Sequence, residues 1–428
     1  MEERFSVSKV VEDGLCVKCG TCVSVCPKNA IILELKTNIG TFCPKVDESI
    51  CNLCGFCTES CPGQSVDFIQ LTRNIFKKDP QKPHIGNFIN CFIGYSCDND
   101  IRYNSSSGGV ITAMLIQALD MGIINGAVLT RMKKDIPLEP EPFIARTRQE
   151  IIEATGSKYC PVPLNIMVKD LLRTNVGEKF AIVGLPCHLH AIRKLEMINK
   201  KLKNKIVIHI GIICSKCPSF LATKYLLNRY SVELEMIENI KYRGGGYPGG
   251  MTIILKGGEE KNIAFLDYYD TSFGQFFSPI RCRLCIDFSA ELADISVGDV
   301  FYCQLDKIDK IGSSLIIARS VEGEKFLSDT NVALNIKTES IEDFINGCKW
   351  NIIFKKSDIV MRGFLLGNKL PKYTTYATPK PNIKMRVNIL FFLLVYRFGN
   401  KISNNKKLWI ILRYYGMFIK YAGNLFIK

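Results

Sequence analysis

A spaced run of four cysteines followed by proline occurs twice near the start of the sequence, and it restricts the chain more than any other feature. Both runs have the pattern C-x2-C-x2-C-x3-C-P, and their cysteines are Cys16, Cys19, Cys22 and Cys26, then Cys51, Cys54, Cys57 and Cys61. This spacing is typical of paired 4Fe-4S clusters, because a tight loop offers three thiolates to one cluster and the fourth comes from the other run. One cluster is therefore expected to bind Cys16, Cys19, Cys22 and Cys61, and the other Cys51, Cys54, Cys57 and Cys26.

Structural zinc is the alternative use for clustered cysteines, but zinc sites rarely have this spacing. The repeat predicts an α+β, ferredoxin-like module over residues 1–70. Such clusters move single electrons and do not by themselves transform an organic substrate. Cys43 lies outside the repeat and is expected to be a packed thiol.

Cysteine is also frequent in the chain as a whole, with 19 among 428 residues. That number is too small for a disulfide scaffold and too large for an ordinary cytosolic enzyme, so it indicates metal or redox chemistry. The first residues, MEERFSVSKV, contain no apolar signal core, which favours a cytoplasmic protein over a secreted one.

The net charge of +15 is concentrated at one end. Residues 359–428 contain 13 Lys and Arg and no Asp or Glu, which leaves a charge of only +2 for residues 1–358. The charge therefore indicates a basic tail and not a body that binds nucleic acid.

The tail is expected to be helical and too interrupted to span a membrane, because the apolar run 389–396 is far shorter than the ~20 residues that a spanning helix needs. Lys406, Arg413 and Lys420 share one helical face with Asn424. The opposite face contains Leu408, Ile411, Tyr415, Phe418, Ile419, Ala422 and Phe426. This amphipathic pattern fits peripheral contact with an anionic membrane at its inner face, or packing against the protein's own body or a partner.

Residues 105–358 are expected to form an α/β domain, with residues 71–104 as a linker before it. Apolar segments predict strands at 127–130, 180–184, 205–214, 251–255 and 293–300, with helices between some of them. An apolar helix is expected from Val110 to Met121.

Three features of this domain suggest a site. The run Ser105, Ser106, Ser107, Gly108, Gly109 opens the apolar helix and predicts either an anion site or a plain serine cap. Cys187 lies in a strand-to-helix turn, and 243–250 is a glycine-rich loop where backbone passes close to another group or simply forms a flexible hairpin. Cys282-x2-Cys285 and Cys214-x2-Cys217 have metal-ligand spacing, but the two pairs lie much farther apart in the chain than the pairs of a zinc ribbon.

Six motifs in order resemble the beta subunit family of coenzyme F-420-reducing hydrogenase and formate dehydrogenase, over residues 85–330. They are IRYNSSSGGVITAMLIQAL, TGSKY, VGLPCHLHAIRKL, IGIICSKCPS, YRGGGYPGG and RCRLCIDFSAELADISVGDV. The resemblance implies FAD in the α/β domain and a third 4Fe-4S cluster whose ligands match Cys187, Cys214, Cys282 and Cys285. Cys217 occupies a variable position of the family pattern, although it is the alternative to Cys214 as a ligand. Tyr247 stands where many relatives have Trp.

The resemblance also implies the residues that bind FAD. The serine–glycine run 105–109 and Gly156, Ser157, Lys158 and Tyr159 match segments assigned to the cofactor. Arg243, Gly245 and the pair Gly298-Asp299 match further motifs. His188 and His190 follow Cys187 and are expected to pack rather than to relay protons.

These parts predict an iron–sulfur flavoprotein oxidoreductase. FAD accepts a hydride and releases electrons singly, so it would connect a small-molecule hydride donor or acceptor, coenzyme F-420 first of all, to three clusters and a redox partner protein or subunit. One alternative is a ferredoxin-driven FAD reductase of an organic substrate, for example in polysaccharide biosynthesis. Another is a non-catalytic electron-transfer subunit.

Overall fold

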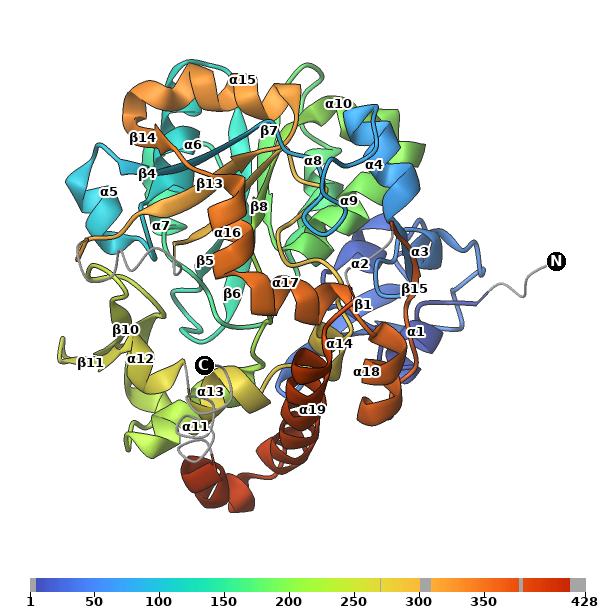
Figure 1. Cartoon of the computed structure of the whole chain (residues 1–428), viewed down its shortest axis with the longest axis vertical. Coiled ribbons are helices and arrows are strands. Elements are labelled where there is room, and N and C mark those ends of the chain that lie inside the picture. The colour runs from blue at the N-terminus through green and yellow to red at the C-terminus, as the bar shows by residue number, and fades with distance from the viewer. Residues whose placement is uncertain (1–4, 270, 301–308, 377–379, 416–428) are drawn as a thin grey trace.

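An eight-stranded mixed sheet forms the middle of the molecule (Figure 1). The computed structural model describes residues 5–269, 271–300, 309–376 and 380–415. In sheet order the strands are β14 (Leu334–Thr338), β4 (Asn90–Ser96), β13 (Ser314–Ala318), β12 (Ile295–Asp299), β8 (Ile206–Ile212), β7 (Phe180–Gly184), β5 (Gly126–Met132) and β6 (Pro140–Ala145).

The four strands β12, β8, β7 and β5 run parallel, and antiparallel strands complete the sheet on both sides. Alternate side chains of β5 and β7 enter two apolar clusters, as expected for strands buried on both faces. One cluster includes α6 (Val110–Asp120) and α15 (Val321–Thr330). The other includes α8 (Val168–Leu171), α9 (Pro186–Ile198) and α10 (Lys200–Lys205). The predicted α/β domain and its five strands are therefore present.

A smaller three-stranded sheet lies beside the main one, with the order β11 (Glu260–Ala264), β10 (Gly250–Leu255) and β9 (Ile237–Lys241). It packs with three helices in one apolar cluster: α11 (Phe220–Arg229), α12 (Phe265–Tyr268) and α13 (Ser272–Phe276). The strand predicted at 251–255 belongs to this smaller sheet and not to the main one.

The N-terminal module contains the antiparallel pair β1 (Ile31–Lys36) and β2 (Thr41–Val46). Of its short helices, α1 (Ser8–Glu12) packs on β2, α2 (Thr21–Val25) packs on β1, and α3 (Phe56–Glu59) packs on α2. The module's third strand, β3 (Ser65–Asp67), pairs in parallel with β15 (Lys372–Thr374) from the C-terminal region. A strand from the C-terminal region thus forms part of the N-terminal module.

The expected linker over 71–104 is wrong in one respect. This segment completes α4 (Phe68–Phe76), forms α5 (Asn99–Asn104) and supplies β4, which lies inside the main sheet between β14 and β13. The asparagines and prolines of this segment suggested a loop, but it contains a strand whose Cys91 and Ile93 side chains are buried. The segment is therefore part of the domain core.

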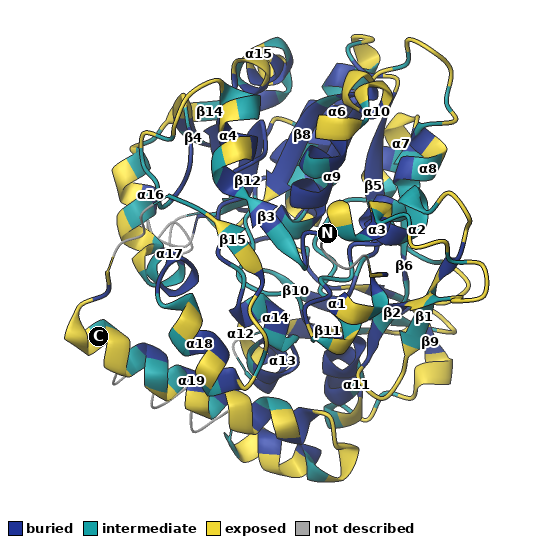
Figure 2. Ribbon diagram, turned by 90° about the vertical axis from the view of Figure 1, so that its right-hand side faces the viewer, coloured by how far each residue is buried: buried dark blue, intermediate teal, exposed yellow. Residues whose placement is uncertain are grey.

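The C-terminal region is helical, as predicted, but most of it packs on the body. It includes α16 (Ile341–Gly347), α17 (Lys349–Lys356), α18 (Ile359–Leu366) and α19 (Ile383–Ser403). Figure 2 shows α19 along the edge of the molecule, with exposed turns on its outer side. None of the helices within the described ranges combines the length and apolar character needed to cross a bilayer.

The apolar face expected for the final helix differs from the one observed. Up to Tyr415, the side chains of Trp409 and Leu412 are buried in the cluster of the smaller sheet, whereas Ile411 is exposed. Leu408 and Tyr415 pack against the same cluster, so this stretch docks on the body. The remaining residues of that prediction, Phe418, Ile419, Lys420, Ala422, Asn424 and Phe426, lie outside the described residues.

Candidate functional site

A cavity opens where the parallel strands end. Its walls include Thr130 in the second half of β5 and the last residues of β7, β8 and β12, which are Gly184, Ile212 and Asp299. The cavity has a volume of about 210 Å³ and is open to solvent. Open α/β sheets bind ligands at this carboxyl edge, because the loops there converge.

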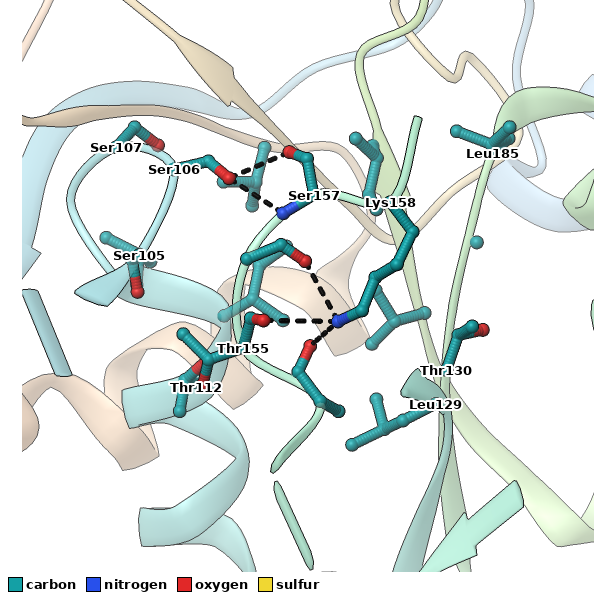
Figure 3. Close-up of a pocket in the computed structure, with 18 of the residues that line it drawn as sticks. Ser105, Ser106, Ser107, Thr112, Leu129, Thr130, Thr155, Ser157, Lys158 and Leu185 are labelled. Atoms are coloured by element: carbon teal, nitrogen blue, oxygen red, sulfur yellow. Dashed lines mark hydrogen bonds between the residues drawn. The ribbon is translucent and has the colours of Figure 1, made fainter. Parts of the chain in front are cut away.

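The serine–glycine run forms one wall of this cavity (Figure 3). Ser106 Oγ accepts a hydrogen bond from the Ser157 backbone N–H and lies 2.8 Å from Ser157 Oγ, so the run and the TGSKY segment are joined. Helix α6 begins after Gly109, whose φ of 73° is left-handed, and within the described residues no side chain caps it. Of the two sequence interpretations, the structure therefore does not form the plain serine cap, and the first residues of α6, Val110, Ile111 and Thr112, line the cavity.

Gly108 is the member of this run that does not line the cavity. A Cβ at this position would lie 2.4 Å from the Gly94 carbonyl oxygen and 2.8 Å from the Ser314 backbone nitrogen. The glycine therefore permits close packing between the loop and the sheet. A side chain here would disturb the fold before it met any cofactor.

Lys158 reaches along the cavity wall to the end of α7 (Arg148–Glu153). Its ammonium donates to the carbonyls of Ala154, Thr155 and Gly156 at 2.5, 3.1 and 3.0 Å (Figure 3). Burial lowers the pKa of Lys158 to about 7, while the three carbonyls favour its charged form. This side chain is a cation that a bound anion would stabilise.

Tyr159, the last residue of the TGSKY segment, contacts Arg243. The Arg243 guanidinium donates to Asp299 Oδ2 at 2.5 Å and to the Tyr159 hydroxyl at 3.4 Å, and it lies over the Phe265 ring. Its Nη2 is buried and has no hydrogen-bond partner among the residues that the structure describes. A second, wider cleft lies here, bounded by Gly245 and Arg243 and sharing Gly156, Ser157 and Lys158 with the first cavity.

The central cysteines converge on a third cavity. Cys187 is the second residue of α9, Cys214 follows β8, and Cys282 and Cys285 belong to or follow α14 (Ile280–Arg283). Burial raises the pKa of the Cys187 thiol well above its usual value, and the nearby thiols of Cys214, Cys285 and Cys282 raise it further. The four residues that the family pattern selects are therefore neighbours, although the chain brings them from three distant segments.

Cys217 is the fifth cysteine at this cavity. Its Sγ donates to the Cys160 carbonyl at 3.2 Å, and burial raises the pKa of this thiol, as do the neighbouring thiols of Cys282 and Cys214. Among the described residues, no three Cys, His, Asp or Glu side chains converge closely enough to hold one metal ion directly. A 4Fe-4S cube holds its ligands farther apart, because iron and sulfide lie between them.

The two histidines after Cys187 have structural partners. His188 Nε2 lies 3.0 Å from the Val162 carbonyl, and burial lowers the pKa of His188 to about 4, so it is neutral at physiological pH. His190 Nε2 lies 2.8 Å from Asp287 Oδ2 in a buried pair. These contacts fit the packing role expected for both.

The cysteines of the N-terminal repeat gather in two places of the module. Burial raises the pKa of Cys22 well above its usual value, and the neighbouring thiols of Cys19, Cys16, Cys61 and Cys57 raise it further. Around a separate small cavity lie the cysteines of the second group: Cys26, Cys51, Cys54 and Cys57. Cys43 is buried in β2 outside both groups, as expected for a packed thiol.

The first of these groups adjoins the central cysteines. Cys16 lines the cavity that contains Cys187 and Cys282, and the thiol of Cys19 is close enough to raise the pKa of Cys187. Arg281 fastens this contact, because it donates to the carbonyls of Leu15 at 3.1 Å and Pro62 at 3.2 Å. The module is thus held directly against the central site.

Several supporting residues carry no signal in the sequence. Arg362 is fully buried and donates to the backbone carbonyls of Arg283, Cys285, Lys355 and Ser357. Lys355 Nζ donates to the Cys282 carbonyl at 3.0 Å. A lone arginine near a basic tail gave no reason to connect it with a cysteine loop much earlier in the chain.

Family models account for most of the chain. The model for the C terminus of the coenzyme F420 hydrogenase/dehydrogenase beta subunit matches residues 177–344, and the model for its N-terminal part matches residues 91–169. A 4Fe-4S dicluster domain matches residues 15–65.

Individual relatives agree with these models. The chain is 26% identical over 355 residues to coenzyme F420-dependent sulfite reductase of Methanocaldococcus jannaschii, covering 79% of this chain and 49% of that protein. It therefore spans about half the length of that relative. It is 28% identical over 261 residues to coenzyme F420 hydrogenase subunit beta of Methanococcus voltae, covering 60% and 86%.

A solved structure shares the fold. It is a chain of the F420-reducing NiFe hydrogenase complex from Methanosarcina barkeri, with a TM-score of 0.53 and 21% identity, covering 68% of this chain and 98% of that one. The family models confirm the predicted resemblance: this chain belongs to the coenzyme F420 hydrogenase/dehydrogenase beta subunit family of oxidoreductase subunits and has a 4Fe-4S dicluster domain in front.

Proposed function

We propose that the chain passes electrons between a hydride donor, most simply the coenzyme F-420 deazaflavin, and three 4Fe-4S clusters by way of FAD. One observation carries this proposal: the cavity at the sheet edge adjoins the cavity of the central cysteines, which in turn reaches the module. The cavity at the sheet edge shares Val162, Leu185 and His188 with the cavity of the central cysteines, and that cavity includes Cys16 of the module. A continuous sequence of redox sites needs this adjacency.

The residues of the first cavity fit FAD. The start of α6 and the hydroxyls of Ser106 and Ser157 offer donors to a pyrophosphate, and the Lys158 ammonium supplies a positive charge beside them. The unpartnered Nη2 of Arg243 is a further buried donor, on the side of the wider cleft. When bound, FAD would supply the conversion of a two-electron hydride into single electrons.

The protein's own side chains set the surroundings of that chemistry. Apolar residues such as Leu115, Leu129 and Val183 line part of the first cavity. Neutral His188 and Leu185 form the partition toward the central cysteines. The wider cleft, which shares the TGSKY segment, is the natural position for the hydride donor or acceptor.

The ligand sets follow from the cysteine groups. We assign the central cluster to Cys187, Cys214, Cys282 and Cys285, the next to Cys16, Cys19, Cys22 and Cys61, and the last to Cys26, Cys51, Cys54 and Cys57. The last group lies in an exposed part of the module, where Ile50, Leu53 and Phe56 are exposed apolar residues. A redox partner protein or subunit would exchange electrons there. Because the ligand thiols must stay reduced, a cytoplasmic compartment suits this role.

The test is anaerobic reduction of the purified, cofactor-loaded chain with reduced deazaflavin, NADH, NADPH or reduced ferredoxin, followed by the flavin absorbance. Reduced deazaflavin alone should bleach the flavin. Bleaching only by reduced ferredoxin would favour the reductase of an organic substrate instead, and absence of flavin would favour a non-catalytic electron-transfer subunit.

The flavin position has its own control. Ser106→Asp adds a negative charge at the cavity wall and should abolish FAD binding, whereas Ser106→Ala should retain most of it. Gly108 is unsuitable for this purpose because any side chain there collides with backbone.

A further inference from the structure

Helix α19 is apolar on two opposite faces. On the inner face, Ile389, Leu393 and Tyr396 are buried in one cluster with Leu284 and Phe354. A helix that packs on a body through a single face normally shows polar residues on the other. The outer face of α19 does not follow this rule.

The outer face presents a row of large apolar side chains. Its members recur at intervals of three or four residues and are between 43% and 83% exposed: Ile383, Val387, Phe391, Leu394 and Phe398. The Phe398 ring also contacts the edge of the Tyr415 ring, with 5.3 Å between the ring centroids. At 1.5 Å per residue the row is about 22 Å long. Contiguous exposed apolar surface of this kind marks an interaction site. Helix α18, which packs beside α19, adds exposed Val360 and Phe364.

The charge around the row has one sign. On the helix, exposed Lys384 lies on one side of the row, exposed Arg397 lies on the other, and Lys401 follows its end. After Asp358 the sequence contains no acidic residue, while it contains 13 Lys and Arg. Asp358 itself is 3.7 Å from Arg386 and so offsets only one of these charges.

We propose that α19 lies flat on an anionic lipid surface, with this row in the boundary between headgroups and acyl chains. Apolar residues on one helical face with basic residues beside them are the pattern of interfacial helices. Lysine and arginine near an anionic leaflet add electrostatic attraction that weakens with salt. A lipid surface explains the uniform charge of the whole region, since it presents anionic groups over a wide area rather than at single positions.

This contact differs from the one that the helical pattern of residues 406–426 predicts. Within the described residues, Trp409 and Leu412 of that stretch are buried against the body. The membrane contact therefore belongs to α19, on the side opposite the central cysteine loop. The proposal does not depend on the redox function, because it concerns where the chain binds and not what it reduces.

The inner face of α19 contacts the central cysteine loop, and this contact limits which variants can test the proposal. Arg283, between Cys282 and Cys285, lies over the rings of Tyr396 and Phe392. Deleting the tail would disturb the cysteine loop together with the membrane contact. Point substitutions on the outer face of the full-length chain avoid this problem.

The experiment is co-sedimentation of the full-length, cofactor-loaded chain with vesicles of equal parts phosphatidylglycerol and phosphatidylcholine, and with phosphatidylcholine alone. The chain should bind the anionic vesicles at low salt and release them at high salt. The triple variant Ile383→Gln, Val387→Gln, Leu394→Gln should bind at least tenfold more weakly. A matched variant with Ile32→Gln, Val176→Gln and Val332→Gln, three exposed apolar positions outside the tail, should bind as the unchanged chain does.

Unchanged iron content and circular dichroism establish that both variants are folded. Equal binding by the two triple variants, or no binding of the unchanged chain to anionic vesicles, overturns the proposal. Doubling of the mass in solution that only the α19 variant abolishes, without vesicle binding, would assign the row to a second copy of the chain and would overturn it as well.

Discussion

The two cysteine regions of this chain are built in contrasting ways. In the N-terminal module, all eight cysteines of the repeat lie between Cys16 and Cys61, and two short loops supply both groups. In the central domain, four cysteines come from the ends of two strands and from a short helix, and they are spread from Cys187 to Cys285. The first region shows that a spacing alone can encode a cluster site. The second shows a site that exists only when the sheet, α14 and the tail are assembled.

The largest expected effect is a loss of iron from the central region alone. With three clusters the chain should contain about twelve irons. Cys282→Ala should reduce this to about eight and leave the spectroscopic signals of the module intact, whereas Cys43→Ala should change nothing. Iron and zinc analysis of the anaerobically reconstituted chain measures it. Eight irons with bound zinc in the unchanged chain would contradict the third cluster.

The next effect tests whether the central site depends on the tail. Arg362→Met removes a buried cation that donates to four backbone carbonyls around the Cys282–Cys285 loop. Leaving those carbonyls unpaired should lower the free energy of unfolding by about 3 kcal/mol and reduce the occupancy of the central cluster. Chemical denaturation and iron analysis measure both. Arg386→Met, at an exposed ion pair, is the control and should cost less than about 1 kcal/mol.

A smaller effect concerns the charge in the first cavity. The pKa of Lys158 is lowered to about 7, so the free side chain loses its proton as the pH rises through this value. An anionic cofactor favours the protonated form, so binding takes up a proton, and FAD affinity should fall by roughly tenfold per pH unit above about pH 7. Titration of FAD binding at several pH values measures this slope. Lys158→Met should bind weakly at every pH, and a slope that persists in it would assign the titration to another group.

The smallest effect is the iron content of two serine variants, which decides whether Cys214 or Cys217 is a ligand in the central region. Because the Cys217 thiol donates to the Cys160 carbonyl, Cys217→Ser should keep about twelve irons. Cys214→Ser should lose about four. The opposite result would exchange the two cysteines in the ligand set without affecting the module.

The contrast between the two cysteine regions also explains which parts of the fold and of the site can be predicted from the sequence. The crossed groups of the module and the five strands follow from local patterns, because spacing and apolar runs are local properties. Strand β4 was not predicted because its neighbours along the chain are polar. Its partners in the sheet, β13 and β14, come from the last third of the chain. Arg362 was not predicted for a similar reason, since two of its four carbonyl partners, those of Arg283 and Cys285, belong to a distant loop.

The end of the chain shows how local geometry can mislead. Lys406 to Leu408 form a 3-10 turn before the next helical residues begin. Such a turn has three residues per turn instead of 3.6, so it shifts the phase of the helical face that follows. Trp409 and Leu412 consequently point to the core, where a continuous α-helix would have placed Ile411.

The central claim is that the central cysteine site connects the flavin cavity with the module. The most direct test is anaerobic mixing of reduced deazaflavin with the loaded chain and with Cys282→Ala, followed by the flavin absorbance and the electron paramagnetic resonance of the module's clusters. In the unchanged chain both should be reduced. In Cys282→Ala the flavin should bleach while the module's clusters stay oxidised, although dithionite still reduces them. Equally fast reduction of those clusters in both proteins would contradict the account.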